Sequence, residues 1–262
     1  MLKVEEIIKA IEKADSIYPP VEGLIEYLPA DNYIANFFDD PHPHSNRVSC
    51  AQLDESNADQ TIKELIRFYT IRKVNFLWSI GPNSRPANLE QYLLDNNLKF
   101  TDTADGLYLD HLKPYELPKT EFEIKEIPVV ADSPTIRTMA EGFGIPYESS
   151  KKSHENYAQF AKHLTMRTYA AFAKGVDYPV GCAFTTYYPD QPLALLVGGC
   201  TLKDYRGRGI YNVFLKKRIN DVIADGINTV VVIADVTTSA PICAKFGLKK
   251  ACELKYYTYL LK

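Results

Sequence analysis

The chain has 262 residues, of which 46% are hydrophobic and 12% aromatic, so it can form a sizeable core and is not expected to be disordered. At about 150 residues per domain, this length allows one or two domains. The formal net charge of −3 gives no overall attraction to nucleic acid or to an anionic membrane.

The first half of the chain predicts an α/β module that begins with an amphipathic helix. Apolar residues recur over residues 4–14 at the spacing of one helix face, and Pro19-Pro20 ends that segment. Further helices are expected at 57–69 and 88–95. The expected strands are 33–37, 47–53, 74–80 and 98–112, the last forming one or two strands around Ala104-Asp105-Gly106.

Two prolines within five positions make residues 113–119 irregular. We therefore predict a domain of residues 1–113, a linker at 114–120 and a second domain of residues 121–262. The helices expected in the second domain are 133–142, 153–164, 209–224 and 239–246, with a break at 143–147 between the first two. The expected strands are 121–127, 168–174, 178–187, 193–202, 229–234 and 248–261.

The two halves share an order of elements: a helix, an apolar strand, a loop, a short helix and a long final strand. This order covers residues 57–112 and again 209–261, with little residue identity between the copies. The pattern indicates an internal structural repeat, although two α/β modules of similar size could also share it by chance.

The N-terminal residues carry charge and have no apolar signal core, and no segment has the roughly 20 apolar residues that cross a bilayer. We expect a cytoplasmic protein with neither a membrane nor a nucleic-acid partner. The five cysteines are odd in number and include no CxxC pair, which predicts neither a disulfide framework nor a zinc site. His42 and His44 lack further ligands nearby, so we expect no metal.

A glycine-rich turn between the strand 193–202 and the helix 209–224 is the strongest functional signal. A strand, a glycine turn and a helix point backbone N–H groups at an anion. Gly207 and Gly209 would allow close approach of phosphate oxygens, and Arg206 and Arg208 could pair with them. The residues that keep this neighbourhood basic are Lys203, Lys216, Lys217 and Arg218. A tight turn with merely solvated arginines is the alternative.

The segment Tyr205-Arg206-Gly207-Arg208-Gly209-Ile210 resembles motif A of the GNAT superfamily of N-acetyltransferases, whose core is Gln/Arg-x-x-Gly-x-Gly/Ala. Arg206 and Gly209 match the first two fixed positions, whereas Tyr211 stands where Gly or Ala is usual. Lys245-Phe246-Gly247-Leu248 is similar to the family's Lys-x-Gly-Phe. The resemblance covers about residues 121–262, and the first half looks like a degenerate copy without a phosphate-binding turn.

The resemblance implies an α/β (α+β) fold of tandem GNAT-like modules, each a mixed, mainly antiparallel twisted sheet flanked by helices. It implies acetyl-CoA as co-substrate, with its pyrophosphate on the amides of residues 207–211 and its pantetheine arm along the end of the preceding strand. Gly198 and Gly199 predict a bulge in that strand. The implied cofactor-binding residues are Gly199, Cys200, Thr201, Arg206, Gly207, Arg208, Gly209, Ile210 and Tyr211.

The implied reaction is direct attack by an amine on the acetyl thioester in a ternary complex, with a base for the amine and a proton donor for the leaving thiolate. Cys243 stands where the family often has a tyrosine acid, although it could simply pack beneath its helix. Glu141 and Tyr147 lie near the break at 143–147, where the family builds acceptor sites. Weaker candidates are Glu148, Tyr187, Tyr188 and Asp235.

Together these features predict an N-acetyltransferase acting on acetyl-CoA and an unidentified amine, with its oligomeric state left open. One alternative is a catalytically impaired protein that binds CoA or a partner, since the usual tyrosine acid and a strand carboxylate are missing. Another is a tandem-module aminoacyl or long-chain acyl transferase.

Overall fold

The computed structural model describes residues 2–261, apart from the side chain of Asp15. By its internal contacts the chain forms two compact units: the residues up to Tyr108 together with those from Ile233 onward, and Leu109–Val232. These units do not coincide with the domains expected at 1–113 and 121–262, because the segment from Ile233 onward belongs to the first unit. The sequence modules themselves stay a prediction.

The first unit contains a sheet region of six strands, in which the last strand of the chain is inserted between two strands of the first half. The strand order is β1-β2-β3-β4-β11-β5, and β11 is antiparallel to both of its neighbours. The strands are β1 (Glu26–Tyr27), β2 (Ile34–Phe37), β3 (Arg47–Ser49), β4 (Phe76–Ile80), β5 (Lys99–Asp110) and β11 (Lys249–Tyr259).

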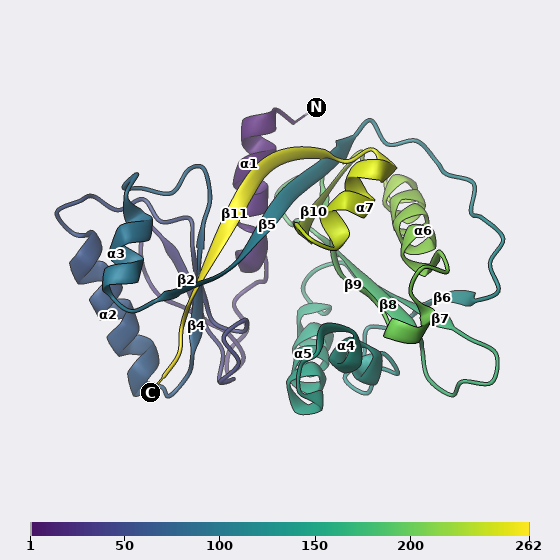
Figure 1. The fold of residues 1–262 in the computed structure, drawn as a ribbon, viewed down its shortest axis with the longest axis horizontal. Coiled ribbons are helices and arrows are strands. Elements are labelled where there is room, and N and C mark those ends of the chain that lie inside the picture. Colours follow the sequence, from purple (N-terminus) through teal and green to yellow (C-terminus); the bar gives the residue numbers. More distant parts are fainter. Residues whose placement is uncertain (1, 262) are drawn as a thin grey trace. The chain divides into compact units, whose positions relative to one another are not determined.

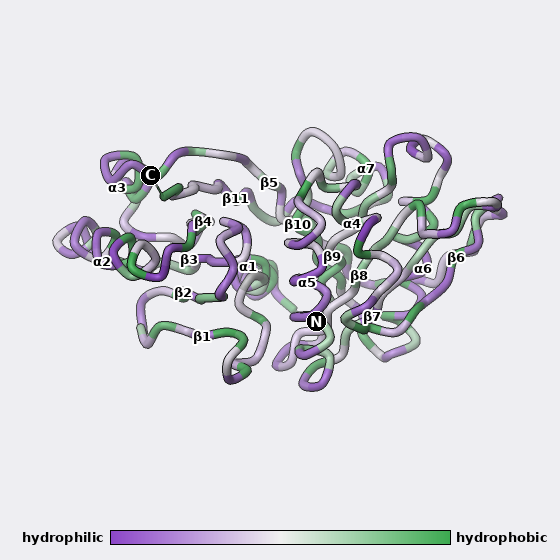
Figure 2. The backbone as a smooth tube through the Cα atoms, turned by 90° about the horizontal axis from the view of Figure 1, so that it is seen from below, coloured by the Kyte–Doolittle hydropathy of each residue, from purple (hydrophilic) through white to green (hydrophobic). Residues whose placement is uncertain are grey.

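Helices cover both faces of this sheet (Figure 1). One face carries α2 (Ala58–Ile71) and α3 (Leu89–Asp95), whose apolar residues surround the buried Trp78 of β4 and Tyr257 of β11. The tube of α2 alternates between hydrophilic and hydrophobic residues, as an amphipathic helix should (Figure 2). The other face carries α1 (Val4–Glu12). The helices of the unit also include the 3-10 turn Ala14–Ser16 and α7 (Ser239–Phe246).

Of the one or two strands expected over 98–112, the structure has one continuous strand, β5. Gly106 is needed for space and not for a turn. A Cβ built there would lie 2.6 Å from Sγ of Cys252 and 2.8 Å from Cγ2 of Ile11. The glycine therefore lets α1 and β11 approach the middle of β5.

The second unit contains a sheet region with the strand order β10-β9-β8-β7-β6, antiparallel except for the parallel pair β9 and β10. The strands are β6 (Glu123–Ile127), β7 (Met166–Phe172), β8 (Gly181–Tyr187), β9 (Ala194–Thr201) and β10 (Thr229–Asp235), the last of which runs across the division between the units. The predicted α/β architecture of mainly antiparallel sheets flanked by helices is confirmed.

The two faces of this second sheet carry different helices (Figure 1). On one face, Ile210 and Phe214 of α6 (Ile210–Ala224) pack with Tyr169 of β7 and Ala183 of β8. The other face carries α4 (Ile136–Phe143) and α5 (Tyr147–Phe160). There Met139 and Tyr157 pack on a cluster formed by Cys182, Phe184 and Cys200.

The second helix of this unit begins six residues earlier than the predicted 153–164. Gly144 ends α4 in a left-handed conformation (φ 67°), and Pro146 is the residue before the first turn of α5. The polar run after Tyr147 is helical because Ser150 is buried and its hydroxyl donates to the carbonyl of Ile136 at 2.7 Å. The packing of α5 on α4 thus outweighs the weak helix propensity of serine.

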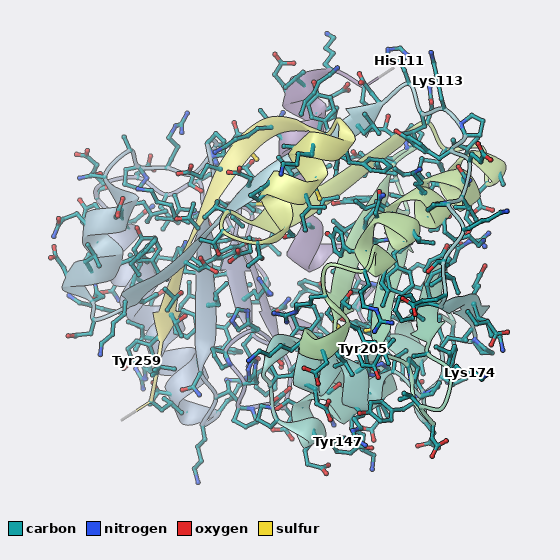
Figure 3. The ribbon with its side chains drawn as sticks, turned by 45° about the vertical axis from the view of Figure 1, so that its right-hand side comes forward. His111, Lys113, Tyr147, Lys174, Tyr205 and Tyr259 are labelled. Carbon is teal, nitrogen blue, oxygen red and sulfur yellow. The ribbon has the colours of Figure 1, made fainter. Side chains whose placement is uncertain are left out.

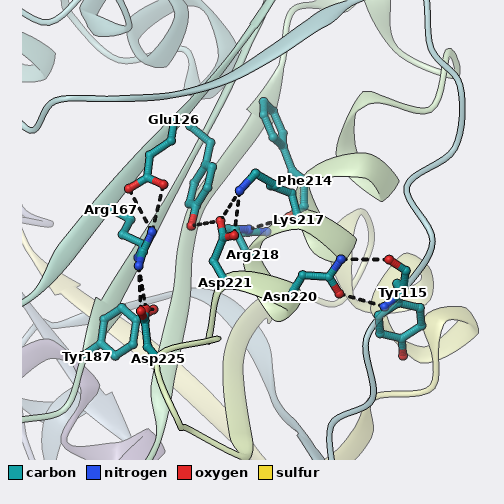
Figure 4. Close-up of polar contacts among 11 residues, drawn as sticks. Tyr115, Glu126, Arg167, Tyr187, Phe214, Lys217, Arg218, Asn220, Asp221 and Asp225 are labelled. Atoms are coloured by element: carbon teal, nitrogen blue, oxygen red, sulfur yellow. Dashed lines mark hydrogen bonds and ion pairs between the residues drawn. The ribbon is translucent and has the colours of Figure 1, made fainter. Parts of the chain in front are cut away.

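The linker contains no helix or strand between β5 and β6, yet it is fastened to α6. Asn220 of α6 accepts from the backbone N–H of Tyr115 at 2.7 Å and donates to its carbonyl at 2.8 Å (Figure 4). Of the helices in the described range 2–261, none combines the length and hydropathy that a membrane span requires.

Candidate functional site

A bulge interrupts β9 at the two glycines where one was predicted. Cys182 pairs with Cys200 and Phe184 pairs with Val197, so β8 advances by two residues where β9 advances by three. Gly198 has φ +61°, a conformation that a side chain disfavours. The extra residue in β9 locally releases backbone groups from the ladder.

Beyond the bulge, β9 has an open edge on its β10 side. Among the residues described, the two strands pair only at Ala194 with Val230 and at Leu195 with Val231. The rest of β9, through Thr201, pairs with β8 alone. An extended ligand bearing amides could therefore add to this edge as a further strand.

The glycine-rich turn leads from the end of β9 into α6 through the 3-10 turn Lys203–Tyr205. Gly207 (φ +74°) and Gly209 (φ +85°) are both left-handed, and a Cβ on either would meet open space. The backbone amides of residues 207–210 have no acceptor within residues 2–261, and no side chain caps α6. Four amides at a helix N-terminus are suited to bind an anion.

The two arginines of the turn are differently engaged. Arg206 donates from Nε to the carbonyl of Thr201 at 3.0 Å, which braces the turn against the end of β9. Arg208 forms a two-point ion pair with Glu121, at 3.1 Å from Nε and 2.7 Å from Nη2, and lies over the ring of Phe122. A carboxylate thus occupies Arg208, and a phosphate would have to exchange with it.

Tyr211, at the position where the resemblance expects Gly or Ala, packs its ring on the bulge. A Cβ built on Gly199 would lie 2.9 Å from Cε2 of Tyr211 and 3.6 Å from Nη2 of Arg218. Position 199 therefore has room for glycine only. Because Gly199 has no side chain, the large ring of Tyr211 fits against it.

Arg218 was predicted to add to the basic surface around the turn, but it does not lie at the surface. Its side chain is buried, with 1% exposed, and donates from Nη1 to the carbonyl of Phe184 and from Nε to that of Phe214. Figure 4 shows this contact to Phe214, and beside it Lys217 paired with Asp221 at 2.6 Å. Nothing in the sequence indicated this burial, because Arg218 directly follows Lys216 and Lys217.

Cys200 turns its side chain toward α4, so only its backbone faces the open edge. Its Sγ lies 3.4 Å from Sγ of Cys182, its partner across the two strands, and leaves no space for a Cβ on Gly142. The hydrogen bond with Cys200, together with burial, raises the pKa of the Cys182 thiol. None of the five cysteines, all within the described residues, forms a disulfide.

The predicted catalytic residues belong to different units of the chain. Cys243 lies in α7, which is part of the first unit, and its side chain is fully buried. Glu141 forms an exposed ion pair with Arg137 at 2.6 Å. Tyr147 begins α5 and is 51% exposed (Figure 3). The acid and base roles given to these residues stay predictions.

Two of the weaker candidates have structural partners. Tyr187 donates a short hydrogen bond to Asp225, which also pairs with Arg167 at 2.8 Å (Figure 4). Burial and this hydrogen bond raise the pKa of Tyr187, so its phenol stays protonated. Asp235 accepts from the amides of Thr237 and Thr238 and shapes the turn after β10. Within residues 2–261, no group of three or more His, Cys, Asp and Glu side chains could hold a metal ion.

Solved structures of other proteins share this architecture, although no match was found by sequence. No model of a protein family matches the sequence, and no curated protein matches it at a significant level. Solved structures match nearly the whole chain. A GCN5-related N-acetyltransferase from Kribbella flavida is similar with a TM-score of 0.71 at 11% identity, over 96% of this chain and 94% of that one. The chain has the GNAT fold.

Two further GNAT structures are similar at comparable length. A tandem GNAT protein from the clavulanic acid biosynthesis pathway has a TM-score of 0.65 at 9% identity, over 98% of this chain and 94% of that one. A GCN5-related N-acetyltransferase from Sphaerobacter thermophilus has a TM-score of 0.64 at 14% identity, over 98% of this chain and 91% of that one. The likeness to a tandem protein confirms the tandem GNAT-like fold. At these identities the likeness concerns the fold alone.

Proposed function

We propose that this protein is a cytoplasmic member of the GNAT superfamily that transfers an acetyl group from acetyl-CoA to an amine. The observation that carries the proposal is that two binding features follow each other directly in the second unit. The open edge of β9 ends at Thr201, and the turn that follows presents the four amides of residues 207–210. An amide-bearing arm joined to a pyrophosphate has the same order of features, which is the chemistry of CoA.

In this proposal the amides of residues 207–210 hold the pyrophosphate, and Arg208 exchanges Glu121 for a phosphate oxygen. The backbone of residues 199–201 pairs with the pantetheine arm. Bound acetyl-CoA supplies an activated thioester. A neutral amine forms the new C–N bond as the C–S bond breaks, the amine loses a proton and the thiolate gains one.

The proton-transfer groups are the least supported part of the proposal. Tyr147 is accessible, whereas Glu141 is engaged by Arg137 and Cys243 is buried. Of the three, Tyr147 has the most accessible side chain outside an ion pair, and it is therefore our first candidate for the proton transfer.

Thermal shift with acetyl-CoA tests the cofactor claim directly. The wild type should be stabilised roughly as RT ln(1+[L]/Kd). Gly209→Val should abolish the shift, because a β-branched residue cannot readily adopt φ +85° and the amides would be reoriented. Gly226→Val is the matched control, with φ +80° in the turn that follows the opposite end of α6. No shift for the wild type would overturn the claim.

A second candidate function is CoA binding without catalysis. The burial of Cys243 and the ion pair of Glu141 favour it, since each removes a group that the reaction could use. Turnover of acetyl-CoA with a panel of amines separates the two candidates. Stabilisation by acetyl-CoA without turnover of any amine would support binding alone.

A further inference from the structure

Two side chains of α6, Tyr211 and Arg218, meet the bulge of β9 from the same face of the helix. Seven positions separate them, which is about two helical turns. The ring of Tyr211 and the guanidinium of Arg218 lie 2.9 Å and 3.6 Å from where a Cβ on Gly199 would be. One aromatic and one cationic side chain of α6 therefore pack against the bulge.

Arg218 also connects the helix to the neighbouring strand at the point where the ladder is irregular. Its Nη1 donates to the carbonyl of Phe184 at 3.1 Å, and Phe184 is the β8 residue of the last regular pair before the bulge. Its Nε donates to the carbonyl of Phe214 at 3.2 Å, which fixes the guanidinium against its own helix. A bulge leaves groups of the ladder without strand partners, and Arg218 supplies a donor there.

The burial of Arg218 makes this arrangement specific. A guanidinium stays protonated in proteins, and burying its charge is costly unless hydrogen bonds compensate. Lysine could restore one donor but not the forked pair, and methionine could restore only the volume. The identity of this residue therefore matters to the bulge beyond filling space.

We propose that Arg218, together with Tyr211, positions the bulge of β9 and thereby the pantetheine arm and thioester of the bound acyl-CoA. Arg218 acts through the backbone of Gly198 and Gly199, so it is a positioning residue. The proposal rests on the proposed function. It separates two parts of one ligand, because the pyrophosphate binds at residues 207–210 whereas only the arm reaches the bulge.

The test compares two ligands on the same variants: acetyl-CoA, and 3′-phospho-ADP, which has the pyrophosphate but no pantetheine arm. For Arg218→Met the Kd of acetyl-CoA should rise about tenfold, the scale of one charged hydrogen bond, while that of 3′-phospho-ADP stays within about twofold. Arg218→Lys should recover part of the loss. Lys217→Met is the matched control, since this adjacent cation pairs with Asp221 and does not reach the bulge.

The outcomes are distinguishable. If the wild type binds neither ligand, the proposed function fails. If the wild type binds both and Arg218→Met weakens both equally, Arg218 supports the fold in general and the inference is overturned. Unchanged affinity for acetyl-CoA overturns it as well.

A second route covers the case in which Arg218→Met does not fold. Gly199→Ala disturbs the same bulge from the strand side, because its Cβ would press on Tyr211. The same selective loss of acetyl-CoA affinity is expected, with 3′-phospho-ADP unaffected. Equal losses for the two ligands would count against the proposal here too.

Discussion

The ring of Tyr211 rests on the backbone of Gly199, at a distance that excludes any side chain on the glycine. The two residues complement each other across α6 and β9. The glycine, in a bulge, provides the volume that the tyrosine occupies. The large residue at 211 is therefore accommodated by its neighbour and does not distort the turn, since Gly207 and Gly209 keep the left-handed conformation.

This complementarity predicts non-additive effects on stability. Gly199→Ala should lower the free energy of unfolding by about 1–3 kcal/mol through overpacking. Tyr211→Ala should remove most of that penalty, so the double variant should be more stable than the sum of the single effects indicates. Urea unfolding of the four proteins measures the coupling. Additive effects would mean that Tyr211 does not limit position 199.

Glu121 should compete with a phosphate for Arg208. Glu121→Gln removes the carboxylate of the ion pair, so acetyl-CoA should bind about two- to fivefold more tightly at low ionic strength. The gain should shrink at high salt, where exposed charges are screened. Calorimetric titration at two salt concentrations measures it. Glu123→Gln, which breaks the nearby pair with Lys125, is the control and should have no effect.

Stability should fall as the solution is acidified, partly through His154. This buried imidazole contacts the carbonyl of Ser150 at 2.8 Å and the hydroxyl of Thr135 at 2.9 Å, and burial lowers its pKa. In the unfolded chain the imidazole of His154 takes up a proton near pH 6.5, whereas in the folded protein it does so only at lower pH. The free energy of unfolding therefore decreases as the pH falls from about 6.5 toward the pKa of the folded state.

The slope from this one group is at most about 1.4 kcal/mol per pH unit. His154→Gln should flatten the profile measured by urea unfolding between pH 7 and pH 5. Burial also lowers the pKa of His44, to about 4, so a residual slope should persist in the variant. An unchanged profile would show that His154 titrates alike in both states.

Tyr257 of the last strand should stabilise the first unit. Its side chain is buried in the core that contains Trp78, the single tryptophan of the chain. Tyr257→Ala should cost about 3–5 kcal/mol, as truncation of large core aromatics does. The red shift of Trp78 fluorescence on unfolding in urea should therefore occur at lower concentration. Lys255→Ala, on the same strand but exposed, should shift the midpoint little.

Much of the fold could be predicted because it depends on local periodicity. The amphipathic spacing of α2 and the β-branched run of β10 were each placed within a few residues. The start of α5 was missed because its first turns are polar, and only the buried contact of Ser150 with α4 explains them. The choice between one and two strands over 98–112 stayed open, because the close contacts of Gly106 come from Ile11 and Cys252, far away in the sequence.

The candidate site divides in the same way. The turn from Arg206 to Gly209 was predictable, since glycines ahead of a helix have a local conformational meaning. The burial of Arg218 was not, because a cation next to Lys216 and Lys217 has the composition of a surface patch. Its hydrogen bond to Phe184 depends on how α6 packs on β8.

The sequence by itself therefore determined most of the secondary structure elements, the bulge of β9 and the glycine turn before α6. Each of these follows from preferences of residues close together in the chain. Only the tertiary structure decided that β11 pairs with β4 and β5, that Tyr211 and Arg218 converge on Gly199, and that Cys243 is buried. Strand partners and burial result from contacts between distant residues, which periodicity along the chain does not specify.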